Sequence, residues 1–326
     1  MTLAKRAGEL VLILLLSTVV FLFIGELFLR VYLSSHIFYD VEMARYARML
    51  KVDSDNALIG HVHRPGSQGK FMGVDVKINS AGFRDREYPL ERGEEWRIIA
   101  LGDSLTFGWG VEKEESFEYL LERELNRARP TEIINFAAGN YNTVQQVNLF
   151  LDKGLAYQPD QVVLFYFIND AEPVPKESAL AWLGSSRLAT FFWSRVKALS
   201  ASRGPEAGFA TFYRDLYRDD AEGWRNAKIA MKELRDTCRG NGIQLQAVLL
   251  PELHELVDYT FASEHALIGD YLRSLDIPVL DLAPSFSGET RPIELWVAPD
   301  DAHPNARAHE QIFGYSLPFI IEGMRP

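Results

Sequence analysis

The sequence predicts an α/β protein built on a parallel β-sheet. Short, continuously apolar segments recur between residues 96 and 282, and amphipathic segments of helical length separate them. Apolar runs of this length suit strands that helices bury on both faces. Three of the runs also end in small or polar residues, and the carboxyl ends of successive βαβ strands lie together at one edge of a sheet. We therefore expect one α/β body whose reactive groups gather at that edge.

Composition limits the classes of protein that fit this chain. Its 326 residues, 47% of them hydrophobic, can bury one sizeable core with additions. The formal net charge of −11 opposes a broad nucleic-acid surface, since phosphate binding requires concentrated lysine and arginine. The single cysteine, Cys238, excludes an internal disulfide and a thiolate metal cluster, and its helical setting predicts a core thiol.

The amino-terminal segment has the composition of a membrane anchor. Leu10–Gly25 carries no charge, follows two basic residues and continues into a further apolar stretch. The segment is long enough to span a bilayer if Glu26 and Arg30 pair on one helical face near its end. No convincing small-x-small cleavage site follows it, and a buried soluble helix is seldom apolar on every face. We expect residues 1–35 to form a single-pass anchor in the inner (cytoplasmic) membrane, with the body on the periplasmic or extracytoplasmic side.

Residues 36–95 are expected to form a β-rich preface to the main sheet. Apolar alternation over residues 74–78, flanked by turn residues, predicts a β-hairpin. The apolar stripe of Asp40–Leu50 is interrupted, so a short helix is the most it predicts. His61 and His63 would point to the same side of a strand, but no carboxylate or cysteine pattern accompanies them. Exposed strand histidines are therefore favoured over a metal site.

The segment Trp96–Gly110 contains our candidate nucleophile. Its apolar run ends abruptly at Gly102-Asp103-Ser104, which places a serine one tight turn past a strand. A serine hydroxyl is a poor nucleophile, so Ser104 requires a base, a group that orients the base, and donors for an oxyanion. The same tripeptide is also ordinary turn chemistry, and the remainder of the chain has to decide between the two interpretations.

Two further strands deliver polar groups to the same edge. Ile133–Phe136 runs into a small-residue turn that contains Gly139, and Val162–Phe167 runs into Asn169-Asp170. The other expected elements are helices over about Ser116–Ala128, Thr143–Tyr157, Trp224–Arg239 and Ser263–Leu275, strands over Ile243–Leu250 and Val279–Leu282, and a last helix from about Ala306.

Residues 171–223 interrupt this alternation with a helical insertion. It contains apolar patches around Trp182 and residues 188–199. One interpretation is a lid or acyl-chain wall over the site. A packed helical insertion without that role fits the pattern equally well.

Asp300, Asp301 and His303 supply the missing base and its partner. An imidazole can take the serine proton, and a carboxylate that holds the other ring N–H keeps the correct nitrogen facing the serine. Asp300, three residues before the histidine, fits that role, and Asp301 is its rival. Taken alone, the segment also fits a surface Asp-Asp turn before a helix-capping histidine. His309 is a weaker base candidate, because no carboxylate precedes it at that spacing.

Four short segments resemble, in the same order, the four sequence blocks of the SGNH, or GDSL, hydrolase family. They are Gly102-Asp103-Ser104-Leu105, Gly139, Asn169-Asp170 and Asp300-x-x-His303. The resemblance covers about residue 96 to the carboxyl terminus, interrupted by the insertion. It implies a flavodoxin-like three-layer α/β/α fold for residues 96–326. Four blocks in the family's order are far more specific than any one of them.

The resemblance also implies what each site residue does. Ser104 would be the nucleophile, His303 the base and Asp300 its orienting partner. The oxyanion hole would consist of the Ser104 N–H, the Gly139 N–H and the Asn169 side-chain amide, neutral dipoles that meet the negative charge without rearranging. This chemistry needs neither a metal nor a cofactor, and we expect none.

Three functions fit these expectations. The first is a membrane-anchored serine esterase that cleaves acyl esters, acetyl above all, or acetylated saccharides. The anchored layout, with the preface sequence Asn79–Asp85, also resembles bacterial proteins that transfer acetyl groups to cell-surface polysaccharides with a membrane-bound O-acyltransferase as partner. The third is a non-catalytic carbohydrate-binding assembly subunit, which would not need the complete residue set. One departure from the family pattern is Phe167, where the third block usually has glycine; Asn169 can still reach the site, but the resemblance does not fix the path of that loop or the shape of the acyl pocket.

Overall fold

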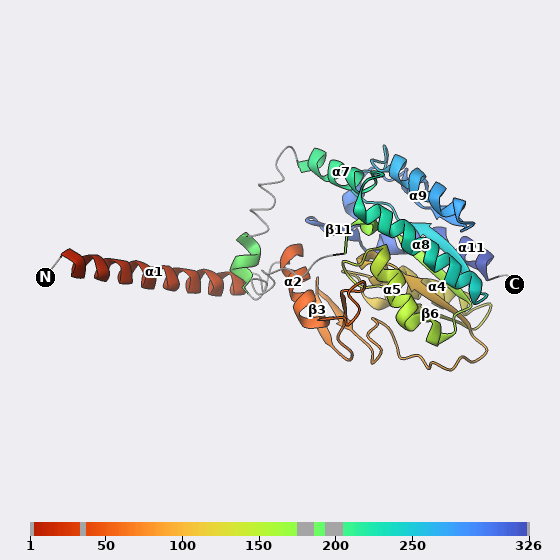
Figure 1. Ribbon diagram of the computed structural model, residues 1–326, viewed down its shortest axis with the longest axis horizontal. Helices are drawn as coiled ribbons and strands as arrows, with labels where there is room; N and C mark the ends of the chain where they lie inside the picture. Colours follow the sequence, from red (N-terminus) through yellow and green to blue (C-terminus); the bar gives the residue numbers. More distant parts are fainter. Residues whose placement is uncertain (1–2, 33–36, 175–185, 193–204, 325–326) are drawn as a thin grey trace.

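The computed structural model describes residues 3–32, 37–174, 186–192 and 205–324. Three parts follow one another along the chain. Helix α1 (Leu3–Tyr32) projects away from the rest, a small region over residues 37–95 comes next, and the α/β body begins at residue 96 (Figure 1).

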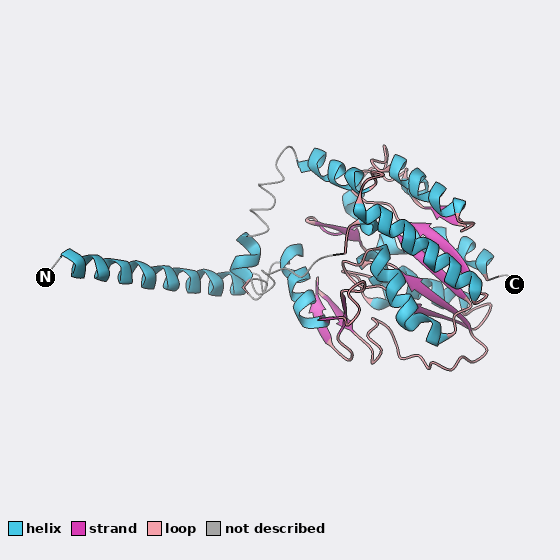
Figure 2. Ribbon diagram, viewed as in Figure 1, coloured by secondary structure: helices cyan, strands magenta, loops and turns pink. Residues whose placement is uncertain are grey.

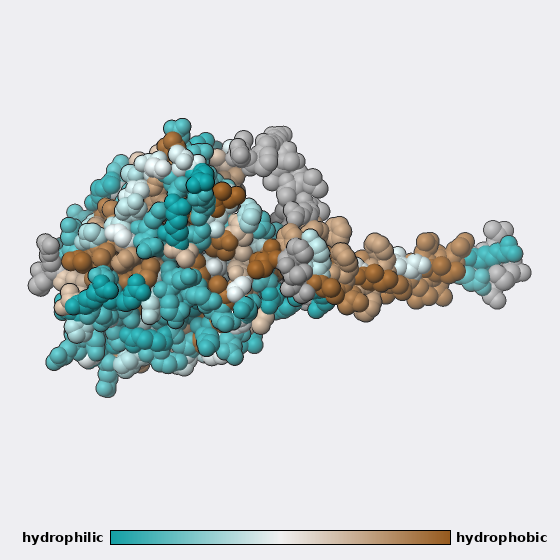
Figure 3. All heavy atoms as spheres, turned by 180° about the vertical axis from the view of Figure 1, so that it is seen from behind, coloured by the Kyte–Doolittle hydropathy of each residue, from teal (hydrophilic) through white to brown (hydrophobic). Residues whose placement is uncertain are grey.

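Helix α1 is apolar on every side. Within Gly8–Tyr32, an 18-residue stretch has a mean hydropathy of 2.7 and no buried residue, and Figure 3 shows hydrophobic colouring along this helix against a mostly hydrophilic body. The expected pair of Glu26 and Arg30 is present, with 2.8 Å between the carboxylate and Nε. The helix is long and apolar enough to span a membrane, and the same length and composition fit a signal sequence.

The preface combines one helix with two short antiparallel pairs of strands. Its elements are α2 (Tyr39–Leu50), β1 (Lys51–Asp53) paired with β2 (His61–His63), and β3 (Gln68–Phe71) paired with β4 (Val74–Lys77). The predicted hairpin is confirmed as β3–β4, and its turn is formed by Met72 and Gly73 with φ of 49° and 85°. Despite its interrupted stripe, α2 buries Val41, Tyr46 and Leu50 against the hairpin and the body.

The expectation that the strand histidines are exposed is wrong. His63 is only 3% exposed, and His61 is partly buried. The Tyr46 ring of α2 packs on His63 and the Tyr141 ring of the body packs on His61. The alternation of a strand shows which side chains share a face, but it does not show what will cover that face.

Five parallel strands form the central sheet. They are β5 (Trp96–Leu101), β6 (Thr131–Asn135), β7 (Gln161–Tyr166), β8 (Gln244–Leu249) and β9 (Val279–Asp281), in the spatial order β6-β5-β7-β8-β9. Numbered along the body, this is the order 2-1-3-4-5 of flavodoxin-like sheets, in which ligands bind at the carboxyl ends of the strands. The sequence prediction of a flavodoxin-like fold is confirmed.

Helices cover both faces of the sheet, giving three layers. Helices α4 (Phe117–Leu125) and α11 (Ala306–Gly323) pack with Ile98 and Ala100 of β5, whereas Ile99 and Leu101 face the other core. That second core is covered by α5 (Thr143–Lys153), α8 (Glu222–Gly240) and α9 (Ala262–Ser274), and Figure 2 shows α5 and α8 lying across the strands. Cys238 is buried in this core, as expected.

Short elements complete the body at the edges of the sheet. They are α3 (Ser104–Phe107), η1 (Lys113–Glu115), η2 (Gly154–Tyr157), η3 (Ile168–Ala171), α7 (Pro205–Leu216), α10 (Ala283–Phe286), η5 (Pro292–Leu295), β10 (Trp296–Ala298) and β11 (Asp301–Pro304).

Residues 186–192 of the insertion contact the end of α1. Residues 187–192 are helical, and the Glu26 carboxylate accepts hydrogen bonds from the Ser186 hydroxyl and the Leu188 N–H, both at 2.9 Å. Trp182 and Trp193, which fit a lid and a packed helical insertion equally well, lie outside the described residues. This contact ties residues 186–192 to the helix proposed as the anchor.

Candidate active site

Ser104 lies immediately beyond the carboxyl end of β5. The strand ends at Leu101, and Ser104 is the first residue of α3, where a backbone N–H has no partner within the helix. The Asp103 side chain caps this helix by accepting a hydrogen bond from the Leu105 N–H at 2.9 Å. Gly108 ends α3 with φ of 79°, a left-handed conformation that glycine adopts without strain. The turn residues thus build the turn that presents the serine.

His303 comes from the carboxyl-terminal part of the chain and lies next to Ser104 in the fold. The Ser104 Oγ lies 2.8 Å from the His303 Nε2, although 199 positions separate the two residues in the chain. Strand β11, which carries His303, lies against α3. The distance is that of a hydrogen bond along which the serine proton can pass to the imidazole.

The expectation that Asp300 orients this histidine is wrong, because Asp301 takes that place. The Asp301 Oδ1 lies 2.5 Å from the His303 Nδ1 and also accepts the His303 backbone N–H at 3.1 Å. Asp301 and His303 both lie on β11, where side chains two residues apart share one face. Asp300 lies in the turn before the strand, and its carboxylate instead lies 3.4 Å from the Tyr39 N–H.

Trp109 completes the row of hydrogen bonds. Its indole N–H donates to the second carboxylate oxygen of Asp301 at 2.9 Å, so both oxygens of this carboxylate have partners. Burial opposes the charged carboxylate, but the hydrogen bonds and charge of His303 hold the pKa of Asp301 below its usual value. Asp301 is therefore charged at neutral pH and able to stabilise a protonated imidazole.

Asn169 follows β7 within η3, and its side-chain amide partly offsets the rise in pKa that burial causes at the Asp103 carboxyl. Asp170, 1% exposed, accepts a hydrogen bond from the Gln146 side chain at 2.9 Å. Burial raises the pKa of both carboxyl groups, and the neighbouring Asp103 raises that of Asp170 further. Phe167 stands where the third family block usually has glycine, and its φ of −119° is one that any residue can adopt. These contacts fix the loop that carries Asn169.

Gly139 is held by the preface. Its N–H donates to the Tyr46 hydroxyl at 3.0 Å, and its carbonyl accepts from the Lys51 ammonium at 2.6 Å. The His61 Nε2 lies 3.2 Å from the same carbonyl oxygen. A Cβ at position 139 would lie 2.8 Å from the Tyr46 ring, which explains why glycine stands here. Donation from the Gly139 N–H to an oxyanion stays a prediction, and it requires the Tyr46 hydroxyl to give way.

Tyr46 has a second polar partner. Its hydroxyl lies 2.6 Å from the His63 Nε2, while the His63 Nδ1 lies 3.2 Å from the Gly82 carbonyl. A proton on Nδ1 satisfies that carbonyl and leaves Nε2 as the acceptor of the Tyr46 hydroxyl proton. Burial lowers the pKa of His63 to about 3, so this histidine is neutral at physiological pH. The Tyr46 oxygen is then free to accept the Gly139 N–H.

Arg84 of the preface holds the loop after the nucleophile. Its guanidinium donates to the carbonyls of Phe107, Gly108 and Val111, with distances of 3.1 Å to Phe107 and 2.7 Å to Val111. Arg84 is 3% exposed, and these bonds meet the needs of its two terminal nitrogens, while its Nε has no partner among the described residues. Sequence reasoning missed Tyr46, Lys51 and Arg84, because the chain pattern does not show that the preface packs on this edge of the sheet.

His309 does not belong to the reacting group. It is fully buried, and its Nδ1 accepts a hydrogen bond from the Phe117 N–H at 3.1 Å. Burial lowers the pKa of His309 to about 3. Its place between α4 and α11 makes it a core residue. Within the described ranges, no group of three or more histidine, cysteine, aspartate or glutamate residues is arranged to hold a metal ion.

A flavodoxin-like sheet that carries a hydrogen-bonded serine, histidine and aspartate at its carboxyl edge defines the class of SGNH-type hydrolases. The model of the GDSL-like Lipase/Acylhydrolase family matches residues 100–311, and the chain belongs to that family. The preface, with Tyr46, Lys51 and Arg84, lies outside the matched residues.

Several solved structures resemble this chain at low sequence identity. A psychrotrophic esterase, EstA from Pseudoalteromonas sp., has 13% identity over 71% of this chain and 99% of its own, with a TM-score of 0.44. An acetyl xylan esterase, AlAXEase, has 16% identity over 69% and 99%, with a TM-score of 0.43. A lipase/acylhydrolase from Enterococcus faecalis has 14% identity over 69% and 94%, with a TM-score of 0.43. No curated protein matches the chain significantly.

Proposed function

We propose that this protein is a membrane-anchored serine esterase that hydrolyses acyl esters, acetyl esters first among them, through an acyl-Ser104 intermediate. The observation that carries the proposal is the continuous row from the Ser104 Oγ through His303 to the Asp301 carboxylate. Membership of the GDSL-like lipase/acylhydrolase family supports esterase or acylhydrolase chemistry.

In the first half of the reaction, the Ser104 Oγ attacks the ester carbonyl while the His303 Nε2 takes the hydroxyl proton. The charged Asp301 holds the Nδ1–H and stabilises the imidazolium that forms. The tetrahedral intermediate then collapses, the C–O bond to the alcohol breaks, and the imidazolium returns its proton to the departing oxygen. The acyl group is left on Ser104.

The negative charge of the tetrahedral intermediate requires donors. We assign this role to the Ser104 N–H, at the open end of α3, and to the Asn169 side-chain amide, with the Gly139 N–H as a third donor once Tyr46 releases it. One well-placed donor is worth about 2.7–4 kcal/mol in such sites.

In the second half, water attacks the acyl-serine with His303 as base, and the free acid leaves. A saccharide hydroxyl can replace water, which makes an O-acetyltransferase with a membrane-bound O-acyltransferase as partner our second proposal. The observation that favours it is burial, since Ser104 is only 5% exposed and a transferase must exclude water. The ratio of free acetate to acetylated saccharide, formed from an activated acetyl donor, distinguishes the two.

We further propose that α1 anchors the body at the outer face of the inner membrane. The apolar length of Gly8–Tyr32 and the basic residues before it support this orientation. Protease added to cells with a permeabilised outer envelope should digest the body. Protection of residues beyond Tyr39 would contradict the orientation, and a mature chain that begins after α1 would show a cleaved signal.

Replacement of the nucleophile tests the esterase proposal directly. We expect Ser104→Ala to lower the kcat for p-nitrophenyl acetate by about 10⁴-fold or more, because no acyl-enzyme can form. An unchanged melting temperature would show that the fold survives. A fluorophosphonate probe should label wild-type Ser104 and leave the variant unlabelled by mass spectrometry. Turnover equal to wild type in the folded variant would overturn the assignment.

A further inference from the structure

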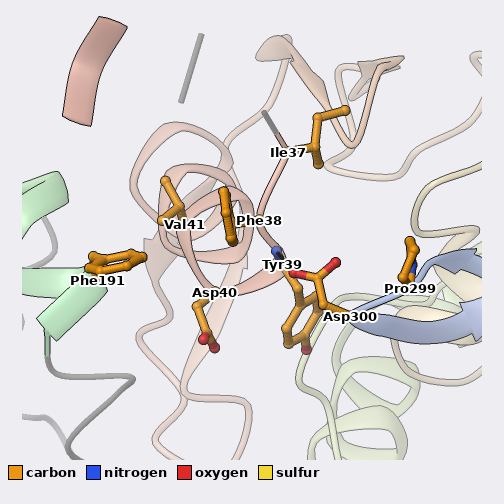
Figure 4. A pocket seen from close by; sticks show the side chains of 8 residues that line it. All are labelled: Ile37, Phe38, Tyr39, Asp40, Val41, Phe191, Pro299 and Asp300. Atoms are coloured by element: carbon orange, nitrogen blue, oxygen red, sulfur yellow. Dashed lines mark hydrogen bonds between the residues drawn. The ribbon is translucent and has the colours of Figure 1, made fainter. Parts of the chain in front are cut away.

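A pocket of about 510 Å³ lies beside the candidate active site, at the end of the body that faces α1. Its walls come from three parts of the chain that are far apart in sequence (Figure 4). The first turn of α2 and the two residues before it supply residues 37–41, the turn between β10 and β11 supplies Pro299 and Asp300, and the insertion supplies Phe191. The family match covers only the second and third of these parts.

Tyr39 lines the pocket and also contacts the reacting groups. Its ring lies 5.5 Å from the His303 ring and 6.4 Å from the Trp109 ring, measured between centroids. The Asp300 carboxylate lies 3.4 Å from the Tyr39 N–H and precedes Asp301 directly. A molecule that fills this pocket is therefore next to the imidazole that serves Ser104.

The lining combines aromatic rings with two carboxylates and with the aliphatic side chains of Ile37, Val41 and Pro299. Phe38 and Phe191 meet edge to face with 6.3 Å between centroids, and Asp40 is drawn between Phe191 and Tyr39 in Figure 4. Asp40 and Asp300 are both exposed. Ionised carboxylates only accept hydrogen bonds, so the matching ligand must donate them while it offers apolar faces to the rings.

This chemistry selects one ligand class. An alkyl chain would suit the aromatic and aliphatic walls, but it would cover the two carboxylates without replacing the hydrogen bonds that they make to water. A phosphate or a uronate would be repelled by the same carboxylates. A neutral sugar residue offers hydroxyl donors around its ring and C–H faces above and below it, which suits both kinds of wall.

We propose that this pocket is a subsite for a neutral saccharide, which holds the sugar part of the substrate while its acyl ester reaches Ser104. The proposal rests on the esterase or acyltransferase function proposed above and names its substrate class. Phe38, Tyr39 and Phe191 provide the faces against which the sugar packs. Asp40 and Asp300 accept hydrogen bonds from its hydroxyl groups.

Two residues that line the pocket are connected to α1. Phe191 belongs to the 187–192 segment, whose start is hydrogen-bonded to Glu26 near the end of α1. Phe38 packs on Tyr32, the last residue of α1, with 6.4 Å between ring centroids. The subsite is thus built on residues adjoining the apolar helix, and it binds a saccharide close to the membrane surface.

The test compares substrates with and without a sugar, using the full chain in detergent. We expect Phe191→Ala, and the double variant Asp40→Asn with Asp300→Asn, each to raise KM for an acetylated xylo-oligosaccharide about tenfold, the effect of one lost contact. Both should leave kcat/KM for p-nitrophenyl acetate within about twofold. Phe212→Ala, an exposed phenylalanine of α7, and Asp270→Asn, an exposed carboxylate of α9, serve as matched controls and should change neither value.

Two results would overturn the subsite. One is an unchanged KM for the acetylated oligosaccharide in both pocket variants. The other is a raised KM for p-nitrophenyl octanoate with no change for the oligosaccharide, which would assign the pocket to an acyl chain.

Binding without turnover separates this proposal from the esterase function. Titration of unacetylated xylotetraose into the Ser104→Ala protein, followed by calorimetry, should show a Kd that Phe191→Ala weakens about tenfold. That result would support the subsite even if the esterase assay failed. Absence of binding to Ser104→Ala, together with normal hydrolysis of p-nitrophenyl acetate by the wild type, would reject the subsite and keep the function.

Discussion

The α/β body and the preface both contact the candidate site, but they contribute different groups to it. The body provides the groups that react or carry charge in the reaction, namely Ser104, Asp301 and His303. The preface provides groups that hold backbone atoms in place. Tyr46 and Lys51 form hydrogen bonds with the backbone of Gly139, and Arg84 forms hydrogen bonds with the loop after α3.

This difference suggests that the two regions fail in different ways. Loss of a body residue removes a chemical step, because no other group in the described part of the site is placed to take over the proton or the acyl group. Loss of a preface residue leaves the reacting groups present and changes how firmly their supporting loops are held. The family match begins at residue 100, so the preface is an addition of this chain to the matched domain.

The largest effect is expected at Asp301. Replacement of this residue by Asn should lower the kcat for p-nitrophenyl acetate by about 10³-fold or more, because the imidazole loses the charge that fixes its tautomer. Asp300→Asn should stay within about threefold, since Asp300 contacts Tyr39 and not His303. Steady-state kinetics of the two neighbouring variants provides the comparison. The reverse order of effects would return the orienting role to Asp300.

Arg84→Met is expected to act on stability. Three buried carbonyls lose their donor, so we expect the free energy of unfolding to fall by about 3 kcal/mol. A melting temperature measured by scanning fluorimetry in detergent checks this, and Arg86→Met is the matched control because Arg86 is half exposed. An unchanged melting temperature in Arg84→Met would show that the preface does not hold the nucleophile loop.

Tyr46→Phe sharpens the comparison, because it removes one oxygen and keeps the ring that fills the core. The Gly139 N–H then loses its acceptor and becomes available to an oxyanion. We expect kcat for p-nitrophenyl acetate to rise about threefold to tenfold, with a stability loss of about 1–2 kcal/mol. Tyr141→Phe, which removes another buried hydroxyl beside β2, should not raise kcat. A fall in kcat for Tyr46→Phe would show that the Tyr46 hydroxyl itself supports the reaction.

The last expected effect is a pH dependence of stability from Lys51. Burial lowers the pKa of this ammonium to about 7, whereas an unfolded lysine titrates near 10.4. Between these values the unfolded chain binds more protons than the folded one, so the Lys51 contribution to stability rises with pH across that window. From pH 6.5 to 10, the melting temperature of the wild type should therefore rise relative to that of Lys51→Met. Parallel curves would show that the ammonium is not sensitive to its surroundings.

Several features of the molecule were predictable because they depend on short-range patterns. The five parallel strands follow from continuous apolar runs separated by amphipathic segments, and the helices between them follow from residues spaced three and four apart. The apolar length of α1 follows from composition alone. Ser104 and His303 were identifiable because the family's blocks keep both their order and their position after strands.

Other features depend on which surfaces pack together, and a linear pattern does not contain that information. The choice between Asp300 and Asp301 was decided by the β10–β11 hairpin, since an extended strand brings a carboxylate two residues away to the imidazole and turns its neighbour outward. Strand alternation applied to residues 301 and 303 would have favoured Asp301. Tyr46, Lys51 and Arg84 carry no such signal, because only the tertiary fold places α2 and the preface strands on the Gly139 and α3 loops. Periodicity determined which residues form strands and helices, whereas long-range packing decided which of their polar groups meet.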